Sequence, residues 1–157
     1  MKKIIVLALV TITLFTFYSC KKSNTHKTNN GQAPASTEWV FNGVTYTASS
    51  ATFTTSNGVS VFAATGAQNN YATIVFNAVP TSNGTYTVTA SAPTPPGTTE
   101  CYVTVGQSPS SNFFSTGKTG IVTVTVSAGL VTAFFSDVSI QTGSAVSILS
   151  GSLVQTQ

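Results

Sequence analysis

Arginine is absent from the chain, and charged residues make up only 6% of its 157 residues. Five of the six lysines precede residue 30, so the formal charge of +3 belongs to the N-terminal segment. From Thr37 onward, Lys118 stands against Glu38, Glu100 and Asp137, which is a net charge of −2. A nucleic-acid interface neutralises a row of phosphates with Lys and Arg, so no nucleic-acid partner is expected.

Histidine and cysteine, the usual ligands of structural zinc, are almost absent. The one histidine, His26, lies in a polar N-terminal segment, and the two cysteines are Cys20 and Cys101. Calcium sites need several clustered oxygen ligands, often from Asp or Glu, and the sequence has no Asp-rich loop. The chain is therefore expected to hold no metal ion and no cofactor.

The same scarcity limits catalysis, because general acid–base chemistry usually relies on a histidine or on two neighbouring carboxyl groups. Glu38, Glu100 and Asp137 lie far apart in the sequence. The Gly-x-Ser-x-Gly elbow of serine hydrolases is missing, and residues 115–120 (STGKTG) lack the leading glycine of a phosphate loop. We expect the chain not to be an enzyme; the remaining alternative is a hydrolase that uses two of these three carboxyl groups.

The N-terminus has the layout of a secretory signal. A basic start, Met1-Lys2-Lys3, precedes an uncharged and mainly apolar run at residues 4–18. As a helix this run would span roughly 22 Å at about 1.5 Å per residue, less than the ~30 Å hydrocarbon core of a bilayer. The expected cut follows Ser19, although Phe17 occupies a position where ordinary signal peptides carry a small residue.

Residues 17–20, Phe-Tyr-Ser-Cys, resemble the signal box of bacterial lipoproteins, with Phe17 where Leu is usual, and the Ser-Cys-Lys ending is similar to that of Bacteroidota lipoproteins. The resemblance implies that residues 1–19 are removed and that Cys20 becomes an acylated N-terminus, whose two or three acyl chains suffice for stable membrane anchoring. The alternative is a signal anchor that is never cut. Surface-exposed members tend to carry acidic residues after the cysteine, whereas Lys21-Lys22-Ser23 follows it here. The expected location is therefore the outer membrane, with the periplasmic face favoured over the cell surface.

Residues 20–36 are polar and show no apolar period, which predicts a flexible tether. Acylation of Cys20 would leave Cys101 without a partner in the chain. Cys101 alternates with Val103 and Val105, which indicates a buried position on a strand. An intermolecular disulfide or a reactive thiol is the alternative, since an odd cysteine in an exported protein is unusual.

Residues 37–157 have the texture of an all-β domain, with short runs rich in Val, Thr, Phe, Tyr and Ile between Gly, Asn, Ser and Pro. The Asn-Gly pairs at residues 42–43 and 57–58 predict type I′ hairpin turns. The expected fold is an antiparallel β-sandwich of roughly nine to eleven short strands, with a closed or partly closed β-barrel as the alternative. The expected strand segments are residues 39–41, 44–48, 51–55, 59–65, 71–77, 85–90, 101–105, 113–114, 121–126, 130–135, 139–142 and 145–154.

Four short motifs of this domain resemble a layout shared by small, mostly uncharacterised Bacteroidota lipoproteins. They are residues 42–48 (NGVTYTA), 84–86 (GTY), 120–125 (GIVTVT) and 150–153 (SGSL), with Tyr46 where Trp is common. The resemblance implies an all-β, sandwich-like domain and no assigned catalytic residues or substrate.

Aromatic residues occur one or two per expected strand, as in the core of a sandwich. Trp39, Tyr71 and Tyr102 are the candidate ligand contacts, because their polar tips suit half-exposed positions. Phe113 and Phe114 point to opposite faces if they are extended, so one of them is a candidate for exposure. The expected function is a non-enzymatic, lipid-anchored envelope protein whose β-domain binds or packs against a partner. A glycan-binding module is the alternative.

Overall fold

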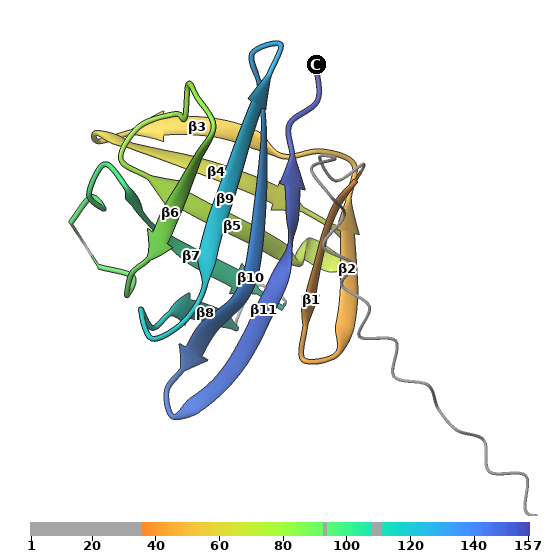
Figure 1. Cartoon of the computed structure of the whole chain (residues 1–157). Helices are drawn as coiled ribbons and strands as arrows, with labels where there is room; N and C mark the ends of the chain where they lie inside the picture. Colours follow the sequence, from red (N-terminus) through yellow and green to blue (C-terminus); the bar gives the residue numbers. More distant parts are fainter. Residues whose placement is uncertain (1–35, 93, 108–110) are drawn as a thin grey trace, which may run out of the picture. The chain divides into compact units, whose positions relative to one another are not determined.

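Eleven β-strands make up the regular structure of the computed structural model, which describes residues 36–92, 94–107 and 111–157 (Figure 1). The only other regular element in these ranges is the 3-10 turn η1 (Ala67–Asn69). The predicted all-β class and the upper strand count are confirmed, whereas the predicted signal peptide, Cys20 and residues 21–35 of the tether lie outside the described residues. The strands are β1 (Thr37–Phe41), β2 (Val44–Ala48), β3 (Thr52–Ser56), β4 (Val59–Thr65), β5 (Tyr71–Phe76), β6 (Gly84–Val88), β7 (Glu100–Gly106), β8 (Asn112–Ser115), β9 (Ile121–Ser127), β10 (Leu130–Thr142) and β11 (Ala145–Val154).

The tight hairpins follow the predicted turn chemistry. Asn42 and Gly43 have φ values of 51° and 75°, and Asn57 and Gly58 have φ values of 51° and 77°. Positive φ at both central residues is what a type I′ turn requires. These turns fix the β1–β2 register with Phe41 opposite Val44, and they fix the β3–β4 register in the same way.

All eleven strands belong to one hydrogen-bonded sheet with the order β2-β1-β11-β10-β9-β6-β7-β5-β4-β3. The sheet folds over on itself, so that β3, β4, β5 and β7 cross behind β6, β9, β10 and β11 (Figure 1). Strand β8 pairs with both β7 and β10, which closes a ring of the five strands β10, β9, β6, β7 and β8. The two layers of the predicted sandwich are therefore joined through β6–β7 on one side and through β8 on the other.

The predicted antiparallel sheet is corrected at one position, because β6 and β7 run parallel. Thr87 lies opposite Glu100, and Val88 lies opposite Cys101. A parallel pair needs a long crossover connection rather than a tight turn. The Pro-rich segment between Val88 and Glu100 provides this connection, and its described residues belong to none of the eleven strands, as the prolines predict.

The segments predicted as two strands, 130–135 and 139–142, are one strand, β10, interrupted by a bulge. Its pairing with β11 shifts between Phe135 and Val138, and Asp137 has a φ of 52°. The backbone N–H of Asp137 donates a hydrogen bond of 3.0 Å to Ser150 Oγ on β11. A bulge bends a strand and increases its local twist, and here β10 pairs with β9 before the bulge and with β8 after it.

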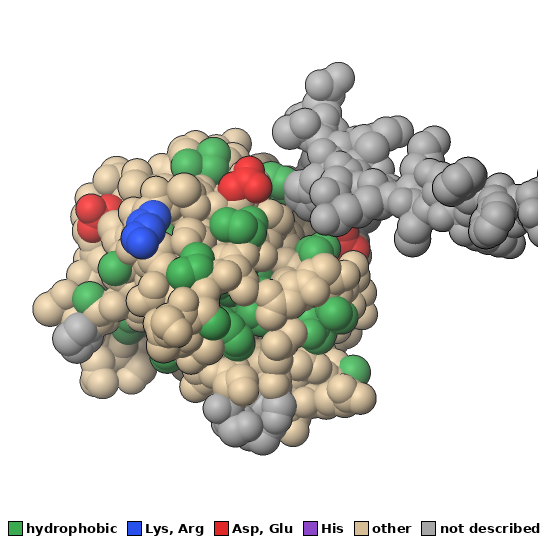
Figure 2. All heavy atoms as spheres, turned by 90° about the horizontal axis from the view of Figure 1, so that it is seen from below, with side chains coloured by type: hydrophobic (Ala, Val, Ile, Leu, Met, Phe, Trp, Pro, Cys, Tyr) green, Lys and Arg blue, Asp and Glu red, His purple; other side chains and the backbone are tan. Residues whose placement is uncertain are grey.

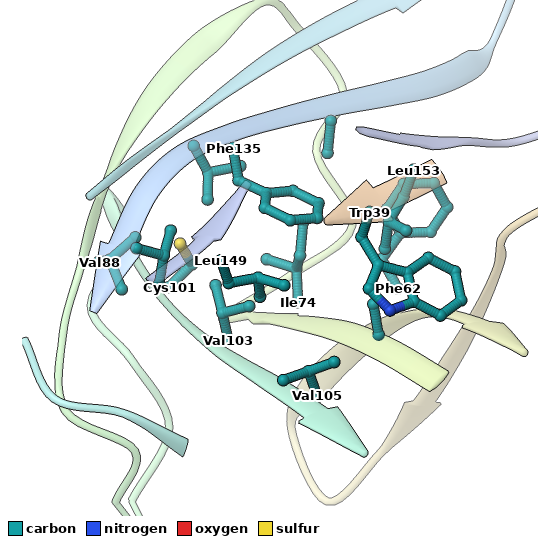
Figure 3. Packing of buried hydrophobic residues seen from close by; sticks show 14 of the residues in the cluster. Trp39, Phe62, Ile74, Val88, Cys101, Val103, Val105, Phe135, Leu149 and Leu153 are labelled. Carbon is teal, nitrogen blue, oxygen red and sulfur yellow. The ribbon is translucent and has the colours of Figure 1, made fainter. Parts of the chain in front are cut away.

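The core lies between the two layers and is built largely from alternate residues of the strands (Figure 3). Cys101, Val103 and Val105 of β7 are fully buried, as predicted; Ile74 lies beside Val103 on the neighbouring strand β5, and Phe135 comes from β10 in the other layer. In β9 the side chains of Val122 and Val124 are buried, while Thr123 and Thr125 are exposed. The largest fully buried side chains are Trp39, Phe41, Phe62, Phe76 and Phe135.

Candidate functional site

Trp39 lies in the core and has no exposed ring face. Its exposed fraction is 0%, and its ring stacks on Tyr46 with centroids 5.7 Å apart. Gly66 and Gly151 pack against it, since a Cβ at Gly151 would lie 2.6 Å from the Cα of Trp39. The prediction of Trp39 as a surface ligand contact is therefore corrected. Trp39 points inward from β1, and the absence of a side chain on Gly151 opposite it leaves room for the indole in the interior. Its Nε1 has no hydrogen-bond partner among the described residues.

The two other predicted contacts, Tyr71 and Tyr102, lie on one surface. The residues next to these tyrosines on β5 and β7 are buried, so the tyrosines themselves point away from the core. Both are partly exposed. Phe114 of β8 lies on the same surface, because it pairs with Thr104, the second residue after Tyr102 on β7. We call this surface, formed by Tyr71, Tyr102, Asn112 and Phe114, the aromatic face.

The ring of Tyr71 lies across the sheet above Gly106. A Cβ at Gly106 would collide with Cδ1, Cε1 and Cζ of Tyr71. The Tyr71 hydroxyl donates a hydrogen bond of 2.6 Å to Asn112 Oδ1. Tyr71 on β5 pairs with Gly106 on β7, and Gly106 pairs with Asn112 on β8. The Tyr71 side chain therefore crosses β7 to reach β8, which lies about 9.6 Å from β5 at ~4.8 Å per strand. A tyrosine can do this only by lying along the sheet, which leaves the outer side of its ring toward solvent.

Partial burial raises the pKa of the Tyr71 hydroxyl. The hydroxyl is therefore protonated at neutral pH and remains a hydrogen-bond donor to Asn112. The Asn112 amide uses only its Oδ1 in this bond, and its Nδ2 is a donor on the opposite side of the same group. Tyr71 and Asn112 thus present a fixed ring and an oriented amide side by side.

Phe114 borders a shallow hollow of about 500 Å³. Phe114 is 44% exposed while its neighbour Phe113 is 8% exposed, which confirms the predicted alternation. The hollow carries no charged lining residue, and its size falls within the range of small-molecule sites. We call it the Phe114 hollow; its lining residues are Ala90, Ser91, Ala92, Phe114, Ser115, Thr116 and Gln141.

The Phe114 hollow forms where the chain leaves the sheet after β6. Ala90 makes an isolated bridge with Thr116, and the N–H of Ser91 donates to the carbonyl of Ser115. The buried Ser115 hydroxyl accepts a hydrogen bond of 3.1 Å from Val103 N–H and donates one of 2.6 Å to the Thr89 carbonyl. The Ser115 side chain thereby connects β8, at the base of the hollow, to β7 and to the segment that follows β6.

A second tyrosine–amide pair lies at the end of β7. Gln107 Nε2 donates a hydrogen bond of 2.6 Å to the hydroxyl of Tyr46 on β2. Gln107 directly follows β7, so the bond connects the edge strand β2 to the layer that contains β7. Tyr46 also stacks on Trp39. This contact stabilises the end of the domain at which Tyr71 begins β5.

The three carboxyl groups proposed for a hydrolase lie apart from one another (Figure 2). Glu38 is on β1 and Asp137 is on β10, and strand β11 lies between these two strands. Glu100 begins β7, and its Oε2 accepts a hydrogen bond of 2.9 Å from Gly97 N–H. Figure 2 also shows hydrophobic patches among mostly uncharged side chains on this side of the molecule.

Cys101 is fully buried beneath these surfaces, and burial raises the pKa of its thiol to about 12. The thiolate, which is the reactive form of cysteine, is therefore suppressed at neutral pH. Among the described residues, no three His, Cys, Asp or Glu side chains are grouped closely enough to bind a metal ion. In the same part of the chain, no helix has the length and apolar character needed to cross a bilayer.

The sequence alone indicated Tyr71 and Tyr102 but not Gly106, Asn112 or Gln141. Only the strand register brings these three residues to the aromatic face or the Phe114 hollow. Comparison with known proteins adds no name to this site: no protein-family model, no curated protein and no solved structure matches the chain.

Proposed function

We propose that the chain is a lipid-anchored envelope protein whose β-domain is a non-enzymatic binding module. The signal-like N-terminus and Cys20 support attachment to the outer membrane through acyl chains, with the periplasmic face as the preferred side. The aromatic face and the Phe114 hollow are the proposed binding surface. No reaction is assigned to the domain.

One observation carries the proposal, namely the fixed position of Tyr71. Tyrosine side chains lose rotamer freedom when they bind a ligand, and this cost is smaller where the ring is already held. Here Gly106 leaves room for the ring, and Asn112 holds its hydroxyl at 2.6 Å. An aromatic ring held in place on the same surface as a hollow lined by neutral residues is suited to binding. The same ring would stabilise the fold more if it were buried in the core.

Site-specific photo-crosslinking tests the binding function. A photoreactive amino acid is placed at Phe114 in the full chain, and a matched variant carries it at Thr125, an exposed position on β9 of the other layer. Irradiation of cells should give a covalent adduct at position 114 and none at position 125. Equal labelling at both positions, or none at either, would contradict a binding role for this surface.

The anchor is tested independently of the binding surface. Mass spectrometry of the mature N-terminus should find an acylated Cys20, and an inhibitor of the lipoprotein signal peptidase should abolish this form. A Cys20→Ser variant should leave the membrane fraction. A full-length N-terminus without modification would show that the anchoring proposal is wrong while leaving the binding proposal intact.

A further inference from the structure

We propose that the ligand of the aromatic face and the Phe114 hollow is a neutral glycan chain whose pyranose rings stack on Tyr71 and Phe114. This inference rests on the proposed binding function and specifies the chemical class of the ligand. It follows from three properties of the surface: the spacing of Tyr71 and Phe114 along it, its neutral hydrogen-bonding groups and its small number of charges.

The two aromatic side chains are spaced along one direction of the sheet. The Tyr71 hydroxyl ends at Asn112, and Phe114 is two residues further along β8, roughly 6.6 Å at ~3.3 Å per residue. Pyranose rings with equatorial hydroxyl groups expose C–H groups on their flat faces, and these faces pack on the faces of aromatic rings. A short run of sugar units can therefore contact Tyr71 and Phe114 in succession and end in the hollow.

Neutral polar groups lie beside these rings at the positions where hydroxyl groups of a sugar chain need partners. The Asn112 amide borders Tyr71, and Gln141 lies directly opposite Phe114 on β10. Ser91 and Thr116 line the hollow beyond Phe114. Amide and hydroxyl groups both donate and accept hydrogen bonds, which matches the hydroxyl groups of a carbohydrate.

Charge on the surrounding strands is nearly absent. Glu100 is the only charged residue of β5, β7 and β8, and it lies six residues before Gly106 on β7. Its carboxylate is engaged with Gly97 N–H. Lys118 is exposed and lies two residues beyond Thr116. Asp137 is exposed on β10, four residues before Gln141. These three charges are separate and of mixed sign, so the surface offers no row of like charges for an anionic or cationic polymer.

The amount of apolar surface also favours a glycan over a protein. Stable protein interfaces bury about 800 Å² on each side around an apolar centre. On the aromatic face, Phe114 is the only large hydrophobic side chain that is well exposed, and Tyr71 and Tyr102 are only partly exposed. The exposed Val146 on β11 lies opposite Gln141, so that Gln141 separates it from Phe114. Isolated ring surfaces between neutral polar groups match the alternating apolar and hydroxyl surfaces of a sugar chain better than an apolar protein patch.

Titration calorimetry on the full chain in detergent micelles tests this inference. The neutral probes are cellohexaose, xylohexaose and laminarihexaose, and the charged comparator is a hexamer of galacturonic acid. We expect at least one neutral hexamer to bind, with an affinity that changes less than twofold between 50 mM and 500 mM NaCl, because no ion pairs contribute. The galacturonic acid hexamer should not bind.

Variants then locate the binding site. Phe114→Ala and Tyr71→Ala should each weaken binding about tenfold, which corresponds to the loss of one stacked ring. Tyr71→Phe keeps the ring and should stay within about threefold of the parent chain. Val44→Ala, which shortens a side chain that is 49% exposed on β2, is the control and should bind normally.

Failure of this inference is distinguishable from failure of the proposed function. If none of the three neutral hexamers binds, or if Val44→Ala weakens binding as much as Phe114→Ala does, the glycan assignment is overturned. If the crosslinked adduct at position 114 is a protein, the surface is a binding site but its ligand is not a glycan. If no adduct forms and no hexamer binds, both proposals are wrong.

Discussion

Gln107 and Tyr46, separated by 61 positions in the chain, are joined by a hydrogen bond of 2.6 Å from the Gln107 amide to the Tyr46 hydroxyl. This bond connects the end of β7 to the edge strand β2. A buried or partly buried hydrogen bond contributes about 1 kcal/mol to stability. Tyr46→Phe and Gln107→Ala should therefore each lower the free energy of unfolding by about 1 kcal/mol.

The double variant should lose little more than either single variant, because both remove the same interaction. Urea denaturation followed through the fluorescence of Trp39, the only tryptophan, measures these differences. Gln141→Ala, at an exposed amide on β10, is the control and should change stability by less than about 0.5 kcal/mol. Fully additive losses in the double variant would show that the two side chains do not act together.

Gly151 is expected to tolerate no side chain. A Cβ at this position would lie 2.6 Å from the Cα of Trp39 and collide with the backbone carbonyl of Glu38. Gly151→Ala should lower stability by about 2–3 kcal/mol, because backbone atoms must separate. Gly84→Ala is the matched control, since its nearest neighbour would be Tyr86 Cε2 at 3.6 Å, and the melting temperature of this variant should stay close to that of the parent.

Ala128 occupies a turn position that favours Asn or Gly. Its φ of 52°, followed by 78° at Gly129, matches the two Asn-Gly turns. Unlike asparagine and glycine, however, alanine does not favour a positive φ. Ala128→Asn should raise the free energy of unfolding by about 1 kcal/mol. Asn57→Ala is the converse change and should lower it by a similar amount in the same denaturation assay. If Ala128→Asn were destabilising, the type I′ assignment of this turn would be wrong.

Stability should fall at alkaline pH because of Cys101. Its pKa is about 12 in the folded protein and about 8.5 in an unfolded chain. The unfolded state therefore loses a proton first, and the stabilisation by the protonated thiol is complete below about pH 8.5 and decreases as the pH rises toward 12. We expect a loss of about 1 kcal/mol between pH 9 and pH 10 in reducing buffer.

Cys101→Ala tests the origin of this loss. The variant leaves a small cavity and is less stable at neutral pH, but its stability should depend less steeply on pH between 9 and 10. A residual slope is expected from Tyr71 and Tyr86, because burial raises both of their pKa values; the further rise that the charge of Cys101 causes at Tyr86 is lost in this variant. An unchanged slope in Cys101→Ala would rule out the thiol as its source.

Local features of the fold were predictable from the sequence because they depend on neighbouring residues. Asn42-Gly43 specifies its own turn, and the alternation of Cys101 with Val103 places them on the inner face whatever strand lies beside them. The parallel pairing of β6 and β7 was not predictable, because it depends on where a Pro-rich crossover returns. Strand β10 looked like two strands because the bulge at Asp137 breaks the alternation without ending the pairing.

The candidate site shows the same division. Tyr71 and Tyr102 were recognised as amphipathic aromatic residues, and their strand positions set the face to which they point. Trp39 belongs to the same chemical class, yet the glycine opposite it on β11 allows it into the core. The roles of Gly106 and Asn112 follow only from the register of β5, β7 and β8. No local sequence pattern around these two residues indicates that they contact Tyr71.

The pairing of β1 with β11 has a consequence for how the domain forms. Thr37 Oγ1 accepts a hydrogen bond of 2.9 Å from Val154 N–H, across a sequence separation of 117 residues. Contacts of such high sequence separation slow folding, because the loop entropy is lost before the contact is made. Strand β1 can pair with β2 through their tight hairpin as soon as both are made, but its other edge has no partner until β11, the last strand, follows. While β11 is missing, the edge of β1 that it covers stays unpaired, so the part of the core around Trp39 and Phe41 is completed only by the last strand.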